Sequence, residues 1–203
     1  PRFEGQAAFI TPPVAAYNAG PAGMVYNPGT ALSERWKNHF FVAEFVGSTR
    51  TRISAFTLKP KGATFELVEE KDVVRGPLAT GLAFGPDGAL YFADWVEGWG
   101  AKDRGRIWKL DDTDSSFAAI RAETQRLLAE DFSNRNETDL QDLLHHTDQR
   151  VRMKAQFALV NRGEAGATAL LAAVQQQDHQ LGRIHGIWGL GQLARKDQKF
   201  AEP

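Results

Sequence analysis

The feature that most constrains the fold is a strand pattern that occurs twice along the chain. Residues 40–45 (FFVAEF) match residues 90–95 (LYFADW) in kind, at an offset of 50 residues. A second matched strand precedes each copy and a third follows it, in the pairs 23–28 with 81–86 and 52–56 with 106–110. Strand-built repeats of roughly 50 residues are typical of β-propeller blades. The sequence therefore predicts two successive antiparallel β-meanders arranged as neighbouring blades.

The first copy is expected to contain four strands and the second three. We place them near residues 23–27, 39–46, 51–59 and 64–75, and then near 79–84, 89–96 and 106–111. In closed propellers, the last blade is commonly completed by a strand from the other end of the chain. Because that strand would lie upstream of residue 1, and because the chain does not begin with Met, we interpret the sequence as an internal fragment of a longer protein. Other blades of that protein would cover the open strand edges and apolar faces.

A second repeat follows, and its period is helical. Residues 152–159 (RMKAQFAL) match residues 183–190 (RIHGIWGL) in pattern, at an offset of 31 residues. Apolar residues at i, i+3 and i+4 predict helices near 117–129, 138–146, 149–162, 166–176 and 181–195. This period is typical of stacked helical pairs of the HEAT type, which bury their apolar faces only against neighbouring pairs.

Single residues refine the helical prediction. Asp148 and Asp178 are expected to be N-caps. Phe157 and Trp188 occupy equivalent positions in the two helical repeats and are expected to lie in the core. The small residues of these repeats should let the helices approach closely; they are Ala155, Ala158, Gly186 and Gly189.

Composition excludes several classes of function. The net charge of −1 and the pI near 6.6 provide no basic stripe for nucleic acid. No run approaches the roughly 18 consecutive apolar residues of a membrane span, so neither a nucleic-acid partner nor a membrane span is expected. The chain contains no cysteine, which excludes disulfides, thiolate metal sites and covalent c-type haem within these residues.

Two acidic residues are the strongest candidates for a binding site. Glu44 and Asp94 occupy equivalent positions near the ends of the second strands, where the following loops of a propeller usually hold the ligand. Nearby charged and aromatic residues would complete a patch suited to a sugar or to a hard cation such as Ca²⁺; they are Arg50, Arg52, Trp95, Glu97 and Trp99. The alternative is structural, with each acid bonding backbone amides or an Arg of the neighbouring blade.

The histidines do not form a metal-ligand pattern. His145 and His146 are adjacent and point to different faces of a helix, and His185 has no second ligand at i+4. We therefore expect His145 and His146 to lie at a solvated helix end, and we assign no metal site.

A resemblance to a known family extends these expectations. Residues 81–94 (GLAFGPDGALYFAD), followed by 105–110 (GRIWKL), resemble the last blade of the glucose/sorbosone dehydrogenase-like propellers. With the helical repeats that follow, and with residues 93–100 (ADWVEGWG), the chain resembles the large haem-binding, membrane-bound dehydrogenase-like proteins of planctomycete and verrucomicrobial type. The resemblance covers residues 21–195. It implies a periplasmic or otherwise extracytoplasmic parent that oxidises a carbohydrate or polyol and passes electrons to its own downstream c-type haem domain.

The chain departs from that family's pattern at the cofactor site. In the quinone-binding sugar dehydrogenases that share the fold, an Arg-x-Arg pair just before the last-blade turn contacts pyrroloquinoline quinone, which is used with Ca²⁺. The aligned residues here are Leu78 and Thr80. They cannot supply the charge-assisted bonds that quinone carboxylates require. The sequence thus argues against quinone binding, and the catalytic His of those enzymes lies in earlier blades.

Taken together, these patterns predict a multidomain β-then-α chain: a partial β-propeller of about two blades followed by a HEAT-like α-solenoid. The expected divisions are a leading loop (1–22), the last two blades (23–112), a connecting helix and linker (113–136) and the helical repeats (137–203). The fragment alone is expected to be inactive. The alternative function is a non-catalytic sugar-binding or scaffold protein that contacts a protein partner through its helical repeats.

Overall fold

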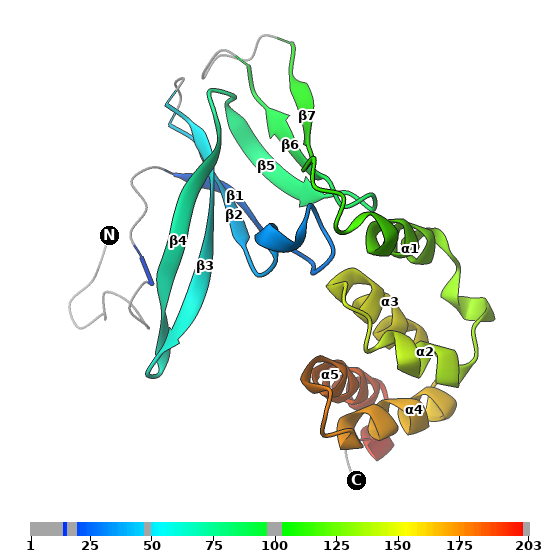
Figure 1. Cartoon of the computed structure of the whole chain (residues 1–203). Helices are drawn as coiled ribbons and strands as arrows, with labels where there is room; N and C mark the ends of the chain where they lie inside the picture. The colour runs from blue at the N-terminus through cyan, green and yellow to red at the C-terminus, as the bar shows by residue number, and fades with distance from the viewer. Residues whose placement is uncertain (1–13, 16–19, 47–49, 97–102, 201–203) are drawn as a thin grey trace. The chain divides into compact units, whose positions relative to one another are not determined.

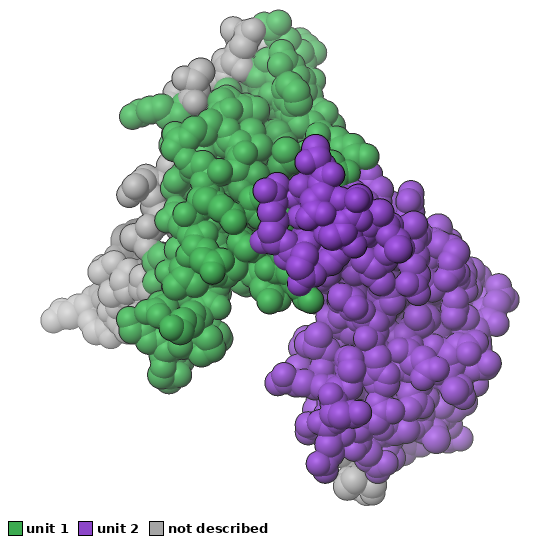
Figure 2. All heavy atoms as spheres, in the orientation of Figure 1, with its two compact units in different colours: residues 1–27, 36–85, 89–111 green, residues 28–35, 86–88, 112–203 purple. Residues whose placement is uncertain are grey.

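The computed structural model describes residues 14–15, 20–46, 50–96 and 103–200. The chain divides into two compact units (Figure 2). The strand unit comprises Pro1–Asn27, Trp36–Gly85 and Ala89–Asp111; the helical unit comprises Pro28–Arg35, Pro86–Gly88 and Asp112–Pro203. The predicted β-then-α order is confirmed, although two short segments from between the strands belong to the helical unit.

The strand unit contains two antiparallel sheets with the predicted four and three strands (Figure 1). The first sheet has the order β1-β2-β3-β4, with β1 Pro21–Tyr26, β2 Phe40–Glu44, β3 Arg52–Lys61 and β4 Thr64–Arg75. The second sheet has the order β5-β6-β7, with β5 Ala79–Phe84, β6 Leu90–Asp94 and β7 Arg106–Leu110. Each sheet is a simple meander, because each strand pairs with the next one along the chain.

The two sheets repeat each other residue by residue. Gly23 pairs with Ala43 in the first sheet, and Gly81 pairs with Ala93 in the second. Both first strands carry the same irregularity, between Pro21 and Gly23 and between Ala79 and Gly81. Glu44 lies opposite Arg52, just as Asp94 lies opposite Arg106. The repeat inferred from sequence is thus a repeat of register as well as of composition.

Each sheet has two faces, which we name by equivalent residues. The front face carries Met24, Val42 and Phe56 in the first sheet and Leu82, Phe92 and Leu110 in the second; the back face carries Phe41, Ala43 and Ile53 in the first and Tyr91, Ala93 and Ile107 in the second. Successive side chains of a strand point to opposite faces, so these sets follow from the register.

The front face of the second sheet packs on the back face of the first. Ala43 and Ile53 form one buried cluster with Phe92, and Leu82 and Leu110 pack against it. The ring of Phe41 meets that of Phe84 edge to face, with 5.5 Å between centroids. The first strands approach most closely at Gly23, where an added Cβ would lie 3.2 Å from the Cα of Gly81.

The helical unit contains the predicted five helices. They are α1 Ala118–Ala129, α2 Glu137–Leu143, α3 Gln149–Val160, α4 Glu164–Gln175 and α5 Gln180–Lys196. Short 3₁₀ turns lie at Glu34–Trp36, Phe132–Asn134 and Gln198–Phe200. As predicted, Asp148 caps α3 by accepting a hydrogen bond from the Arg150 amide. The prediction for α5 is wrong by one residue, because His179 is its N-cap and accepts from the Gly182 amide.

Small residues allow the helices to pack closely. An added Cβ would lie 2.8 Å from the Leu170 carbonyl oxygen at Gly186 and 2.6 Å from the Leu170 side chain at Gly189. Helix α4 therefore lies directly against the backbone of α5. Apart from Phe132, the buried core residues are aliphatic, and Leu140, Val151 and Leu159 are fully buried.

The prediction that Phe157 and Trp188 are core residues is wrong. Their side chains are 45% and 54% exposed, respectively. In α3 the buried stripe runs through Val151, Ala155 and Leu159 at four-residue spacing, and Phe157 lies about 200° around the helix from Ala155. Small residues fill the helix–helix contacts, so the large aromatic side chains remain on the outer surface.

Two strand-to-strand loops complete the helical unit. Thr30, in segment 28–35, is fully buried and donates a hydrogen bond to Asp148 Oδ2 at 2.6 Å. Asp148 also binds the Arg150 guanidinium at 2.8 Å. In segment 86–88, the backbone carbonyl of Asp87 accepts from Arg121 Nε at 2.8 Å. The helical unit thus depends on residues that precede its helices by up to about a hundred positions.

Candidate functional site

Asp94 is buried at the end of β6, and both of its carboxylate oxygens are used. Oδ1 accepts from the backbone amides of Leu78 at 2.9 Å and Val96 at 3.1 Å, and Oδ2 accepts from the indole Nε1 of Trp108 at 2.9 Å. These three donors come from the segment before β5, the segment after β6, and β7. Asp94 therefore fastens three parts of the second sheet.

The ionised form of Asp94 is favoured despite burial. Desolvation opposes the charge, but the hydrogen bond from Trp108 and those from the Val96 and Leu78 amides outweigh it, and Arg106 adds a favourable charge. Together they lower the pKa of Asp94 below its ordinary value. A general base needs a pKa near the working pH, so Asp94 is poorly suited to that role.

Glu44, the equivalent residue of the first sheet, is also buried and engaged. Its Oε1 accepts from Ser54 Oγ at 3.1 Å and from Arg52 Nε at 2.7 Å. Arg52 then continues to Asp72 at 2.8 Å and to Glu70 at 3.2 Å. Burial works against the charge of Arg52, but its bonds to Glu44 and Asp72 raise its pKa. The result is an ion-pair network across β2, β3 and β4.

The remaining candidate residues divide into exposed and undescribed ones. Trp95 is 43% exposed, and its ring contacts that of Phe45 at a centroid distance of 6.5 Å. Arg50 is also exposed. Glu97 and Trp99 lie outside the described residues. Phe45 was missed in the sequence analysis, although its position 50 residues before Trp95 marks it as the equivalent residue of the first repeat.

Chemically, this strand end therefore combines inward acids with an outward aromatic pair. Glu44 and Asp94 act within the sheets, whereas the half-buried ring of Phe45 contacts the exposed ring of Trp95. Aromatic faces flanked by polar groups are suited to binding a ligand with both apolar and hydroxyl surfaces.

The residues at the quinone-contacting positions do not fit that cofactor. The side chain of Leu78 is buried in the strand unit, and its backbone amide is bonded to Asp94. Neither Leu78 nor Thr80 carries a positive charge. Charge-assisted bonds to a polycarboxylate quinone are thus absent at both positions.

His145 and His146 are more buried than the predicted solvated helix end would be. His145 is half-buried, with its ring centroid 4.4 Å from that of His179. His146 Nδ1 accepts from the Asp148 amide at 2.9 Å, and burial lowers the pKa of His146. Among the described residues, no group of three or more His, Cys, Asp or Glu side chains is placed to hold a metal ion.

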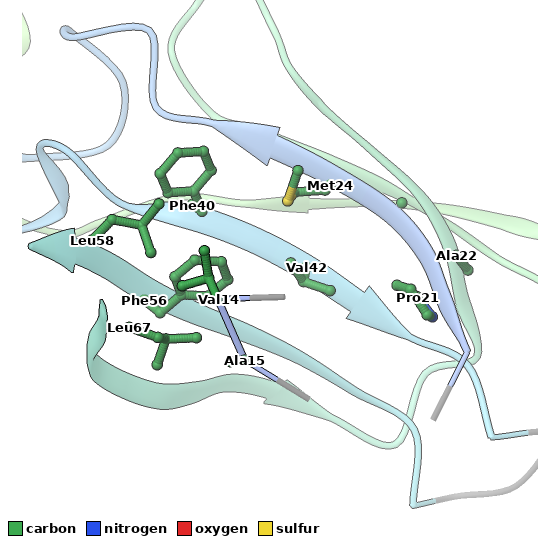
Figure 3. Close-up of a pocket in the computed structure, with 11 residues that line it drawn as sticks. Val14, Ala15, Pro21, Ala22, Met24, Phe40, Val42, Phe56, Leu58 and Leu67 are labelled. Atoms are coloured by element: carbon green, nitrogen blue, oxygen red, sulfur yellow. The ribbon is translucent and has the colours of Figure 1, made fainter. Parts of the chain in front are cut away.

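An apolar hollow lies on the front face of the first sheet (Figure 3). It has a volume of ≈ 770 Å³. Figure 3 shows its walls, which come from β1, β2, β3 and β4 with a short stretch near the N-terminus above them; they include Val14, Met24, Phe40, Val42, Phe56, Leu58 and Leu67. Its described lining residues include no charged side chain, so its chemistry suits packing rather than catalysis.

Comparison with known proteins gives limited information. No protein-family model matches the chain, and no curated protein matches it. One solved structure, a glucose dehydrogenase, is similar over 49% of this chain and 28% of its own length, with 20% sequence identity and a TM-score of 0.37. The matched part thus spans less than a third of that enzyme. No helix in the described ranges is long and apolar enough to cross a bilayer.

Proposed function

We propose that this chain is a non-catalytic binding scaffold, made of two neighbouring β-propeller blades and a HEAT-like helical stack, within an extracytoplasmic protein. Its strand unit would bind a carbohydrate or polyol at the Phe45–Trp95 edge. Its helical unit would bind a protein partner. The proposal rests on how the side chains of each unit are used.

The blade assignment is supported by head-to-tail packing of the two sheets. The front face of one sheet meets the back face of the other, so the contact joins two different surfaces of the same repeat. Such heterologous contacts continue until a ring closes or a chain of units forms. Among the described residues, no further sheet packs on the front face of the first sheet or on the back face of the second, and further blades would cover both.

The apolar hollow supports the same assignment. On the first sheet, the front face carries Met24, Val42 and Phe56 around it. The equivalent residues of the second sheet pack against a neighbouring sheet. A preceding blade is therefore the occupant that the repeat itself indicates for this hollow.

The non-catalytic assignment rests on one observation: the carboxylates of both candidate acids are engaged in structural bonds within the strand unit. Asp94 accepts three hydrogen bonds, from β7 and from the segments that flank β5 and β6. Glu44 is held by Arg52 and Ser54. Neither acid presents a carboxylate to a substrate, whereas Phe45 and Trp95 present aromatic surface.

A sugar-binding titration tests this proposal. The whole chain is titrated with a panel of neutral sugars and polyols while tryptophan fluorescence and heat are recorded. We expect a sugar-dependent signal that is lost in Trp95→Ala and retained in Trp188→Ala, whose tryptophan lies in the helical unit. Equal loss in both variants, or no signal with any sugar, would contradict the carbohydrate assignment.

A second function, sugar or polyol dehydrogenation by a longer parent protein with a c-type haem domain, is favoured by the propeller-like packing. Fold alone does not fix chemistry. The test is reduction of an artificial electron acceptor by the parent protein with the same sugars, with and without added quinone and Ca²⁺. Sugar-dependent reduction would establish the dehydrogenase. Its absence, together with sugar binding, would leave the scaffold function.

A further inference from the structure

Helices α3 and α5 form an apolar groove on the surface of the helical unit. Its volume is ≈ 590 Å³. The large apolar side chains that line it are Met153 and Phe157 from α3 and Ile187 and Trp188 from α5, and all four are exposed. Contiguous exposed apolar patches are uncommon on monomeric proteins and usually mark an interaction site.

The groove is a product of the repeat. Phe157 and Trp188 hold the same position in successive helical pairs, 31 residues apart. The small residues Ala155 and Gly186 fill the equivalent inward positions, where both are buried. Each pair thus places a small residue inside and an aromatic residue outside, so that Phe157 and Trp188 both line the groove.

A buried polar relay fixes the amide groups that line the groove. His185 Nδ1 donates to Gln156 Oε1 at 2.7 Å, and Gln156 Nε2 donates to Gln192 Oε1 at 2.9 Å. Burial, with a further contribution from Arg152, lowers the pKa of His185 to about 4, so His185 is neutral at pH 7. The relay uses the carbonyl oxygen of Gln192 and leaves its amide N–H groups for a backbone carbonyl of a bound chain.

Charge is segregated between the helices of each pair. Within α2 and α4 the charged residues are all acidic, namely Glu137, Asp139, Asp142 and Glu164. Within α3 and α5 they are all basic, namely Arg150, Arg152, Lys154, Arg183, Arg195 and Lys196. The two helices that line the groove therefore contain no carboxylate side chain.

Only some of these cations are used within the unit. Arg150 pairs with Asp148 at 2.8 Å, Arg152 donates to the backbone carbonyls of His146 and Thr147, and Lys154 donates to carbonyls at the end of α1. Arg195 lines the groove, and with Lys196 it lines an adjoining hollow of ≈ 390 Å³ beside Phe157. Neither Arg195 nor Lys196 forms an ion pair within the described part of the chain.

We propose that the α3–α5 groove binds an acidic peptide segment of another protein, with apolar side chains on the floor of the groove and carboxylates at Arg195 and Lys196. Four apolar side chains supply the desolvated centre that hot spots require, and aromatic residues are enriched there. Two adjacent cations supply charge complementarity, which sets partner choice and association rate. A nucleic acid is a poorer fit, because two cations make no stripe and the floor is apolar. The proposal rests on the scaffold function of the helical unit and is independent of sugar binding by the strand unit.

The test uses a random peptide library displayed on phage and selected on the whole chain. We expect the enriched peptides to combine an excess of Asp and Glu with Leu, Ile, Phe or Trp. A synthetic copy of the most enriched peptide is then titrated by fluorescence anisotropy. The double variant Phe157→Ser/Trp188→Ser should weaken binding about tenfold or more, as expected for loss of aromatic anchors. Higher salt should also weaken binding.

Charge reversal gives the sharper measurement. The variant Arg195→Glu/Lys196→Glu should no longer bind the acidic peptide. It should instead bind a matched peptide in which each Asp and Glu is replaced by Lys. Matched controls are Leu171→Ser, an exposed apolar residue of α4, and Arg183→Glu, an exposed cation of α5 outside the groove. Both control variants should bind the acidic peptide with the same affinity as the unsubstituted chain. Circular dichroism confirms that every variant remains helical.

Three outcomes would overturn the proposal. The first is no enrichment over the Phe157→Ser/Trp188→Ser variant used as bait. The second is enrichment without acidic residues, or an affinity unchanged by charge reversal. The third is a dimer in sedimentation that the same double variant abolishes, which would make a second copy of this chain the occupant. Sugar binding at Trp95 is measured separately, so the two proposals succeed or fail independently.

Discussion

The two sheets carry an isoleucine at the same register position with opposite exposure. Ile53 lies opposite Ala43 in the first sheet and is 1% exposed, whereas Ile107 lies opposite Ala93 in the second sheet and is 71% exposed. The local sequence and the pairing partner are alike. The difference arises because the back face of the first sheet is covered by the second sheet and no described element covers the back face of the second.

The front faces show the complementary difference. Met24 of the first sheet is 63% exposed, whereas the equivalent Leu82 packs against the buried cluster between the sheets. In the described part of the chain, each sheet thus has one face that packs against the other sheet and one face without a neighbouring sheet, on opposite sides. A repeat of this kind acquires its core from its neighbours, so burial depends on position in the series as well as on residue type.

The largest expected effect separates the two isoleucines. Ile53→Ala should lower the free energy of unfolding by about 2–4 kcal/mol, because it removes buried methyl groups and leaves a cavity. Ile107→Ala should change it by less than about 0.5 kcal/mol, as for other surface substitutions. Urea unfolding followed by tryptophan fluorescence measures both. Equal losses would show that Ile107 is covered in solution. They would contradict the inferred difference between the two back faces.

The next effect concerns the two acids. Asp94→Ala leaves the buried amides of Leu78 and Val96 and the indole of Trp108 without their acceptor, and should cost about 2–3 kcal/mol in unfolding free energy. Glu44→Ala leaves Arg52 with Asp72 and Glu70 but removes the acceptor of the Ser54 hydroxyl, and should cost about 1 kcal/mol. Thermal unfolding at one pH ranks them. A larger loss from Glu44→Ala, or a loss of sugar binding without destabilisation in either variant, would contradict the structural role.

A smaller effect is expected at the paired glycines. Gly23→Ala places its Cβ 3.2 Å from the Cα of Gly81, so the strands must separate slightly, at a cost of about 1 kcal/mol. Gly81→Ala points into open space and should be neutral. The measurement is the shift in urea midpoint for each variant. A neutral Gly23→Ala would show that the sheets are less tightly packed than the structure indicates.

The smallest effect is a pH dependence that belongs to the second sheet. The folded-state pKa of Asp94 lies below its value in the unfolded chain, which is about 3.9. Its contribution to stability is therefore present above about pH 4 and lost as the pH falls through the folded-state pKa. Asp94→Asn should flatten the decline in urea midpoint below about pH 4. If the urea midpoints of the variant and the unsubstituted chain fall in parallel as the pH decreases, other groups are responsible for the decline.

Much of the fold could be predicted because it follows from periodicity. The alternation in β2 and β6 and the 31-residue helical repeat located all seven strands and five helices of the described fold within a few residues. Periodicity identifies which residues share a face, but it does not identify which face will be covered. The prediction for Phe157 and Trp188 is wrong for that reason.

The candidate site was less predictable, because it depends on contacts across the sheets. Arg106 lies directly opposite Asp94 in the register, but the strongest side-chain partner of Asp94 is Trp108, which also belongs to β7. The position of Phe45 beside Trp95 follows from how the sheets stack, although the 50-residue repeat was a usable signal. The Thr30–Asp148 bond joins residues 118 positions apart, and no short-range pattern predicts it.

That bond has a consequence for how such a chain can be divided. A gene fusion that begins at residue 112 would carry all five helices to a new host and leave Thr30 and the Asp87 carbonyl behind. Asp148 and Arg121 would then lose partners that the transplanted piece cannot regenerate. A fusion that keeps the helical unit intact must therefore also include the strand connections 28–35 and 86–88. The two halves of the chain can thus be exchanged in evolution only together.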